Sequence, residues 1–242
     1  MTFLEIQNTL RKLADPEKAA HYCRFFKTGE GEYGEGDRFL GIRVPVLRSY
    51  VREHHYLSFS EILDFLRSPF HEERLYALFI LVRKFEKGSE EEKQDVYSLY
   101  LEHVAFVNSW DLVDCSAPHI VGAWLEKREK TILYRFAKSD VLWERRIAIL
   151  STFHMIRKNS FDDALAISAL LMNDSQDLIQ TAVGWMLREV GKRDIGAEKA
   201  FLRQHLLDMP RTMLRYAIEK FPEHERKRYL ACISGEEISD LR

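Results

Sequence analysis

The stretch RLYALFIL at residues 74–81 decides the fold that the sequence predicts. Three later stretches share its outline of a polar residue followed by an apolar helical run: RIAILSTF at 146–153, QTAVGWML at 180–187 and RYAIEKF at 215–221. Arg74 and Arg146 are 72 residues apart, which is twice 36, and the position halfway between them is Trp110. The resulting frame positions, Arg74, Trp110, Arg146, Gln180 and Arg215, are 36, 36, 34 and 35 residues apart. A period near 35 without strand signals is typical of stacked helix pairs.

Each repeat would consist of an outer helix, a short turn and an inner helix that begins near the frame position. Turn signals precede the inner helices, at Ser68-Pro69, Ser139-Asp140, Asn173-Asp174-Ser175 and Met209-Pro210. No TPR or ankyrin signature is present, and the repeats look most like HEAT units. We therefore expect an all-α, HEAT-like solenoid whose inner helices line a concave groove.

The segments around the repeats complete the expected layout of a single domain over residues 1–242. Two helices are predicted at the start, over residues 2–14 and from Asp15-Pro16 to about Phe26. Residues 27–48 then form a loop, because four of the eleven glycines fall within 29–36. This loop is either a plain connector or a backbone-rich segment that touches a partner. The N-terminal part is 1–45, the repeats are 46–230, and a tail follows at 231–242.

The composition is that of an ordinary globular protein, with 46% hydrophobic and 31% charged residues. No run of eighteen apolar residues predicts a membrane-spanning helix, and the first residues lack the features of a signal peptide. The three cysteines, Cys23, Cys115 and Cys232, are widely spaced. This favours neither a disulfide framework nor a zinc site, and it fits the cytoplasm. We expect a cytoplasmic monomer without a metal or a cofactor.

The frame positions also carry charge, since three of the five are arginines. A row of guanidinium groups on an inner surface would match the spacing of a phosphate backbone. The alternative is that these arginines pair with acids on neighbouring helices, for which Glu73, Glu144 and Asp177 are close enough in sequence.

The stretch VNSWDLVDCSAPHIVG at 107–122 is the hardest to explain by packing alone. On a helix, Trp110 and Asp114 would project from one face, one turn apart, whereas Asp111 would lie on a different side. Pro118 limits how far this helix can run. A carboxylate beside an aromatic ring can stabilise positive charge on a sugar or orient a water molecule. A thiol nucleophile at Cys115 is disfavoured, because no histidine base is evident.

A second aromatic and basic cluster lies in QTAVGWMLREVGKRD, residues 180–194. Trp185, Arg188 and Lys192 share one helical stripe, and Arg193 follows. Gly184 would permit the close approach of a neighbouring helix. The stretch predicts a stacking platform over phosphates. The alternative is a core tryptophan followed by a solvated basic helix end.

With these stretches the chain resembles the AlkD-like DNA alkylation repair glycosylases. The resemblance rests on WDLVDCSAPHIVG (110–122), LWERRIAILSTFHMIRKN (142–159) and QTAVGWMLREVGKRD (180–194), with FLGIRVPVLR (39–48) upstream. It implies a HEAT-like solenoid with a concave DNA-binding groove that hydrolyses the N-glycosidic bond of N3- and N7-alkylated purines in duplex DNA. The family's catalytic aspartate falls on Asp114, its two lesion-contacting tryptophans on Trp110 and Trp185, and its active-site arginine on Arg146.

The chemistry implied by the resemblance suits these residues. An N3- or N7-alkylated purine is cationic, so it leaves without protonation, and the enzyme has only to stabilise an oxocarbenium-like sugar and position water. No lysine near Asp114 offers a Schiff-base nucleophile, so a monofunctional glycosylase is expected. The expected partner is duplex DNA containing alkylated bases, bound through Arg188, Lys192, Arg193, Arg74, Arg215, Lys158 and Arg43.

Two other interpretations stay open on the sequence. A non-catalytic HEAT-like DNA-binding module would keep the basic residues without depending on Asp114. A protein-interaction scaffold, the commonest use of helical solenoids, is favoured by the net charge of −2. The charge is unevenly spread, however, because residues 143–230 hold 15 Lys/Arg against 12 Asp/Glu.

Overall fold

A computed structural model describes residues 2–54 and 56–232 of the protein. Over these residues it is helical, and it forms two compact units, Met1–Ile120 and Val121–Arg242. The predicted tail, 231–242, lies outside the described residues from 233 onward. In the described part of the chain, no helix combines the length and the apolar character that crossing a membrane requires.

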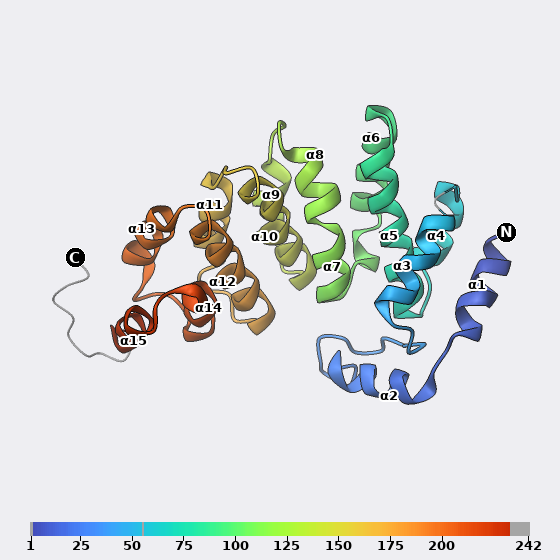
Figure 1. The fold of residues 1–242 in the computed structure, drawn as a ribbon, viewed down its shortest axis with the longest axis horizontal. Helices are drawn as coiled ribbons and strands as arrows, with labels where there is room; N and C mark the ends of the chain where they lie inside the picture. Colours follow the sequence, from blue (N-terminus) through green and yellow to red (C-terminus); the bar gives the residue numbers. More distant parts are fainter. Residues whose placement is uncertain (1, 55, 233–242) are drawn as a thin grey trace. The chain divides into compact units, whose positions relative to one another are not determined.

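In its described residues, the N-terminal unit contains seven α-helices and one 3₁₀ turn, at Val104–Phe106. The helices are α1 (Phe3–Lys12), α2 (Pro16–Phe25), α3 (Val44–Glu53), α4 (Phe59–Leu66), α5 (His71–Lys87), α6 (Glu90–Glu102) and α7 (Trp110–Ser116). Within the unit, α5 packs against α3, α4, α6 and α7. The helices α3, α5 and α7 therefore form a row in which α5 is central (Figure 1).

The C-terminal unit is built in the same way. Its helices are α8 (Ala123–Leu125), α9 (Thr131–Phe136), α10 (Leu142–Ile156), α11 (Asp162–Leu170), α12 (Asp177–Gly191), α13 (Ile195–His205), α14 (Arg211–Ala217) and α15 (Glu223–Cys232), with a 3₁₀ turn at Ile218–Lys220. The row here is α10, α12 and α14, in which α12 packs on both neighbours, while α9, α11 and α13 form the other layer.

These rows confirm the predicted all-α repeat of helix pairs. The frame positions lie in or just after the first turn of α5, α7, α10 and α12, but Arg215 lies in the last turn of the short helix α14. Each of these helices is the second member of a pair. The helices α5, α10 and α12 carry buried residues on every side, as helices in the middle of a stack must.

Gly184 shows how closely the rows pack. A Cβ atom added there would lie 2.4 Å from the carbonyl oxygen of Met213 and 2.6 Å from the Cβ of Tyr216. Only a residue without a side chain permits this approach of α12 to α14. The expectation that Gly184 allows a close neighbour is confirmed.

The helix starts follow from local sequence. Thr2 and Ser58 form capping boxes with Glu5 and Glu61, and Asp15 caps α2 with Pro16 at its first position. The two predicted N-terminal helices are therefore confirmed within two residues.

The glycine-rich loop is shorter than predicted, since α3 already begins at Val44. The end of the loop is fastened to α5, because the buried Glu72 carboxylate accepts hydrogen bonds from the backbone N–H groups of Leu40, Gly41 and Ile42, at 2.8, 2.7 and 3.1 Å. Gly41 has a φ of 82°, and a Cβ there would lie 2.2 Å from the carbonyl oxygen of Asp15. The end of the loop, at residues 39–42, is thus packed against the unit, whereas most of the glycine-rich stretch 29–36 is exposed.

The segment after α7 is unusual. The α-helix ends at Ser116, as Pro118 predicts, but the chain stays helical through a π-helical turn at Pro118–Gly122 before α8 begins. Such wide turns are rare and concentrate at functional sites. This one directly follows the residues that the sequence singles out, Trp110 and Asp114.

Candidate functional site

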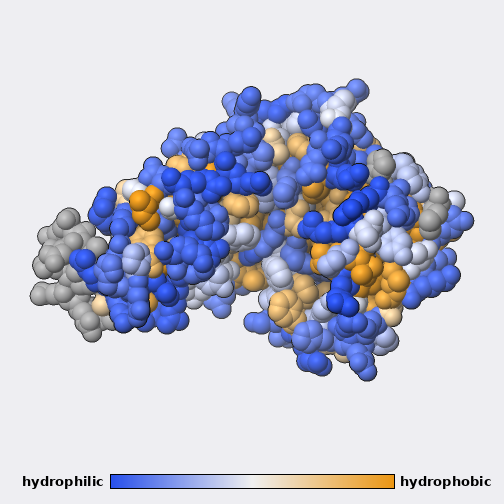
Figure 2. Space-filling view, viewed as in Figure 1, coloured by the Kyte–Doolittle hydropathy of each residue, from blue (hydrophilic) through white to orange (hydrophobic). Residues whose placement is uncertain are grey.

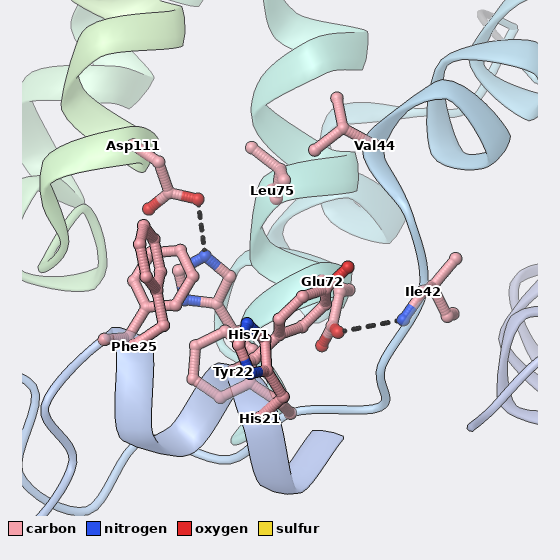
Figure 3. A pocket seen from close by; sticks show the side chains of 11 residues that line it. His21, Tyr22, Phe25, Ile42, Val44, His71, Glu72, Leu75 and Asp111 are labelled. Atoms are coloured by element: carbon pink, nitrogen blue, oxygen red, sulfur yellow. Dashed lines mark hydrogen bonds and ion pairs between the residues drawn. The ribbon is translucent and has the colours of Figure 1, made fainter. Parts of the chain in front are cut away.

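Trp110, the first residue of α7, packs against aromatic side chains at the end of α2. Its indole is stacked on the Phe26 ring, with centroids 5.2 Å apart and planes 11° from parallel, and Phe25 meets it edge-on at 6.0 Å. Phe25 is 58% exposed. These two phenylalanines also line a cavity of about 290 Å³ whose walls are largely aromatic (Figure 3). On the face shown in Figure 2, apolar residues appear next to α2 and around α3 within a largely hydrophilic surface.

A buried charge network lies at the floor of this aromatic cavity. The His71 imidazole joins two carboxylates. Its Nε2 lies 2.8 Å from Asp111 (Figure 3), and its Nδ1 lies 2.8 Å from Asp37. Burial disfavours the charged imidazole, but the two carboxylates outweigh burial and raise the pKa of His71 to about 9. The imidazolium therefore ties the loop and the start of α7 to α5.

Asp114 faces a different cavity, of about 390 Å³, between α3, α5 and α7. The other polar groups that line this cavity are three arginines, one glutamate, a histidine and a cysteine: Arg48, Arg52, Arg83, Glu86, His119 and Cys115. Asp111, one residue after Trp110, lines the aromatic cavity instead. The two acids of α7 therefore lie on different sides of the helix, as the sequence predicts.

Cys115 is unsuited to act as a nucleophile. Burial, together with the nearby carboxylates of Asp111 and Asp114, raises the pKa of its thiol well above the ordinary value. The Sγ atom donates a weak hydrogen bond to the carbonyl oxygen of Leu112 at 3.4 Å. Because the thiolate is the reactive form, this cysteine is inert near neutral pH.

In the C-terminal unit, Trp185 belongs to a cluster around the buried carboxylate of Glu189. The indole N–H donates to Glu189 at 3.1 Å, and the Phe153 ring lies 5.8 Å from the indole. Lys192 contacts the same carboxylate at 2.6 Å, Arg188 at 3.8 Å and Arg193 at 3.9 Å. One acid thus holds the predicted basic stripe beside the tryptophan.

Two of the three frame arginines are not surface residues. Arg74 is only 5% exposed, and its guanidinium holds both oxygens of Asp37 at 2.8 Å. Arg146 is 4% exposed and donates to the carbonyl oxygen of Leu178, at the start of α12. The expected guanidinium row at the frame positions is therefore wrong for these two, because each is used in packing.

The prediction that Arg74 contacts DNA is wrong, because the side chain is buried and paired with Asp37. The suggestion that acids neutralise the frame arginines is right for Arg74, but its partner is Asp37 and not the adjacent Glu73. Glu73 pairs instead with Arg11, at 2.7 Å. Sequence proximity pointed to the wrong acid, because neighbouring residues on a helix project in different directions.

The remaining predicted DNA contacts lie on the surface. Arg43, Lys158, Lys192, Arg193 and Arg215 are exposed. Arg188 is half-buried and also pairs with Glu219. Trp110 and Asp114 belong to the N-terminal unit, whereas Arg146 and Trp185 belong to the C-terminal unit.

Several residues of the site escaped the sequence analysis. His71 and Asp37 do not stand in any motif. Glu189 stands in the stretch 180–194, but no feature of that stretch singled it out. The roles of all three depend on partners that the chain brings together in space. Arg83 and His119 had a usable signal, since they are 36 residues apart and Arg48 precedes Arg83 by 35. These spacings equal the repeat period, so a search for the period at positions outside the frame would have found these residues.

One comparison with known proteins gives a family, and another gives a similar fold. A family model described as DNA alkylation repair enzyme matches residues 6–221. No curated protein matches the chain. Among solved structures, the fold is similar to that of a predicted DNA alkylation repair enzyme from Enterococcus faecalis, with a TM-score of 0.68. That match covers 87% of this chain and 97% of the other, at 19% sequence identity.

Proposed function

The chain belongs to the DNA alkylation repair enzyme family, and from that premise we propose that it is a monofunctional DNA glycosylase. Its substrates would be positively charged N3- and N7-alkylated purines in duplex DNA. The observation that carries the proposal is the position of Asp114, a carboxylate in an open cavity lined by three arginines. The three arginines, which can attract the DNA phosphates, then lie next to the Asp114 carboxylate, which can face a sugar.

The proposed reaction needs little from the protein. The bond from the sugar C1′ to the base nitrogen breaks, and the alkylated base leaves as a neutral molecule with the bonding electron pair. Positive charge develops on the sugar, where the Asp114 carboxylate stabilises it. A water oxygen then forms the new bond to C1′ and loses its proton. Because the base is already cationic, no acid has to protonate it.

Trp110 and Trp185 are proposed to contact the lesion nucleotide. Indole faces stabilise a nearby cation by about 0.5–2 kcal/mol. In the N-terminal unit, Phe26 fixes the plane of Trp110, and in the C-terminal unit Glu189 holds the Trp185 indole N–H. Both rings are therefore oriented before DNA arrives, which reduces the entropy lost on binding.

Arg146 is proposed as a positioning residue. Its guanidinium is buried and fastens α10 to the carbonyl oxygen of Leu178, on the helix that carries Trp185. In this proposal Arg146 acts through Trp185 and not by direct contact with the sugar. The exposed side chains of Arg215, Lys158 and Arg43 are proposed to contact DNA phosphates, together with Arg188, Lys192 and Arg193 around Glu189.

The test is the release of 7-methylguanine from a methylated duplex under single-turnover conditions. Asp114→Asn keeps the shape and removes the charge, so the excision rate is expected to fall by about 10²–10³-fold. Asp95→Asn on α6, which removes an exposed acid outside both cavities, is the control and should excise like the wild type. Release by Asp114→Asn at the wild-type rate would remove Asp114 from the chemistry.

Two other outcomes would point to other functions. Salt-sensitive duplex binding without release of any alkylated base would indicate a non-catalytic DNA-binding module. Duplex binding that is absent or insensitive to salt would indicate a protein-interaction scaffold, because attraction to phosphates weakens as counterions are added.

A further inference from the structure

The cavity beside Asp114 contains a row of basic side chains that the frame positions do not include. Arg48 lies on α3, Arg83 on α5 and His119 in the π-helical turn after α7, and all three line the cavity. Their spacings of 35 and 36 residues equal the repeat period. In a helical-repeat protein, residues one period apart lie at equivalent points of stacked helices. The row is thus a consequence of the repeat, shifted nine positions along from Arg74 and Trp110.

The two arginines of this row lack protein counterions. Within the described residues, neither Arg48 nor Arg83 makes an ion pair or a hydrogen bond in the structure. The Nε atom of Arg83 is buried without a hydrogen-bond partner. The guanidinium of Arg48 lies 4.4 Å above the Phe79 ring, which holds it in place without using its N–H groups. Removing a guanidinium from water without an anion is costly, so the half-buried Arg83 favours an anionic ligand, and the exposed Arg48 beside it can reach the same ligand.

The charges that line the cavity also favour an anionic ligand. Arg48, Arg83 and Arg52 supply three positive charges, whereas Asp114 and Glu86 supply two negative ones. Glu86 is exposed at the edge of the cavity. By contrast, Arg74 and Arg188 elsewhere in the chain are each paired with carboxylates. Arg48 and Arg83 form no such pair in the described part of the chain.

We propose that this cavity binds a backbone phosphodiester of the substrate DNA, with Arg48 and Arg83 as its direct ligands. Guanidinium forks match the oxygens of a phosphate, and phosphate contacts fix the register of a protein on DNA. Held there, the phosphodiester places the adjoining sugar at Asp114. The inference rests on the proposed function, which it deepens by naming the groups that position the scissile nucleotide.

The experiment measures two quantities for Arg48→Gln, Arg83→Gln and the double variant: affinity for an undamaged duplex as a function of salt, and single-turnover excision at saturating protein. Each single variant is expected to weaken duplex affinity about 5–10-fold and to reduce the salt slope by about one phosphate contact. The maximal excision rate at saturation should also fall, by on the order of tenfold in the double variant, because the phosphodiester no longer holds the adjoining sugar at Asp114. Lys12→Gln on α1, an exposed cation outside the cavity, is the control.

The outcomes separate this inference from the proposed function. Unchanged duplex affinity and salt slope in the double variant, with normal excision by the wild type, would overturn the phosphate site and leave the glycosylase standing. Weakened duplex binding without excision by the wild type would support the site and refute the activity. If the double variant binds duplex normally but loses thermal stabilisation by orthophosphate, the cavity takes free phosphate and the proposal is wrong. Circular dichroism of each variant excludes misfolding as the cause.

Discussion

At the scale of single residues, the informative groups are buried charges that have found distant partners. His71 joins Asp37, 34 residues earlier, to Asp111, 40 residues later. Arg74 adds a second cation to Asp37, and the hydrogen bond from His71 and the charge of Arg74 lower the pKa of Asp37 although burial opposes this. The network fixes the start of α7, and with it Trp110, so a structural ion network supports the candidate site.

His71 gives a pH-dependent prediction. Its pKa is about 9 in the folded chain and about 6.5 when unfolded, so the stabilisation is complete below pH 6.5 and is lost as the pH rises through 9. His71→Gln should therefore destabilise the protein most below pH 6.5. The difference in the free energy of unfolding between the variant and the wild type should narrow by up to about 3 kcal/mol by pH 9.5. Urea unfolding followed by circular dichroism at a series of pH values measures it.

His54 is the matched control for this prediction. It is a buried histidine whose Nδ1 contacts the Tyr76 hydroxyl at 2.7 Å, and burial lowers its pKa. Protonation of His54 destabilises the folded chain only when the pH falls below the unfolded pKa of this histidine. The difference in unfolding free energy between His54→Gln and the wild type should therefore stay constant between pH 7 and 9.5. If the difference in unfolding free energy between His71→Gln and the wild type is equally independent of pH, the His71 imidazole is neutral in the folded state.

At the scale of elements, the repeat is maintained by close contact between the second helices of successive pairs. Where α12 meets α14, Gly184 lies against the backbone of Met213. Gly122 plays the same part in the C-terminal unit, since a Cβ there would lie 2.2 Å from the carbonyl oxygen of Ser151 on α10. Backbone atoms cannot move aside as a flexible side chain would, so these glycines set the spacing of the helices.

Gly184→Ala should consequently destabilise the protein by about 1–3 kcal/mol, although alanine favours helix formation. Gly196→Ala on α13 is the control, because that glycine is exposed and its added Cβ would meet only the Asp194 side chain, at 3.1 Å. The control should be neutral or stabilising by a few tenths of a kcal/mol. Thermal unfolding of both variants compares them, and equal melting temperatures would contradict the role assigned to Gly184.

At the scale of the whole molecule, the net charge of −2 hides two different units. Met1–Ile120 holds 15 Lys/Arg against 20 Asp/Glu, whereas Val121–Arg242 holds 21 against 18, giving −5 and +3. The overall charge therefore does not argue against a polyanionic partner. Long-range attraction of DNA would come from the C-terminal unit, and the N-terminal unit would contribute through the local arginines around Asp114.

This division predicts which substitutions change the salt dependence of duplex binding. Lys158→Gln and Arg215→Gln remove exposed cations of the C-terminal unit, and each should reduce the salt slope by about one. Lys18→Gln on α2 is the control, since Lys18 is already paired with Asp15. Equal slopes for all three variants and the wild type would show that the charge of the C-terminal unit does not attract DNA.

The sequence alone determined the helical class, the period near 35 and the helix starts set by caps and prolines, and it singled out Trp110, Asp114 and Trp185 as candidates. These follow from local chemistry and from spacing along the chain. Only the tertiary structure decided which way each helix faces. It placed Arg74 and Arg146 in the interior and aligned Arg48, Arg83 and His119 around Asp114. The physical reason is that a period fixes the distance between equivalent positions, whereas packing and distant polar partners fix the rotation of each helix.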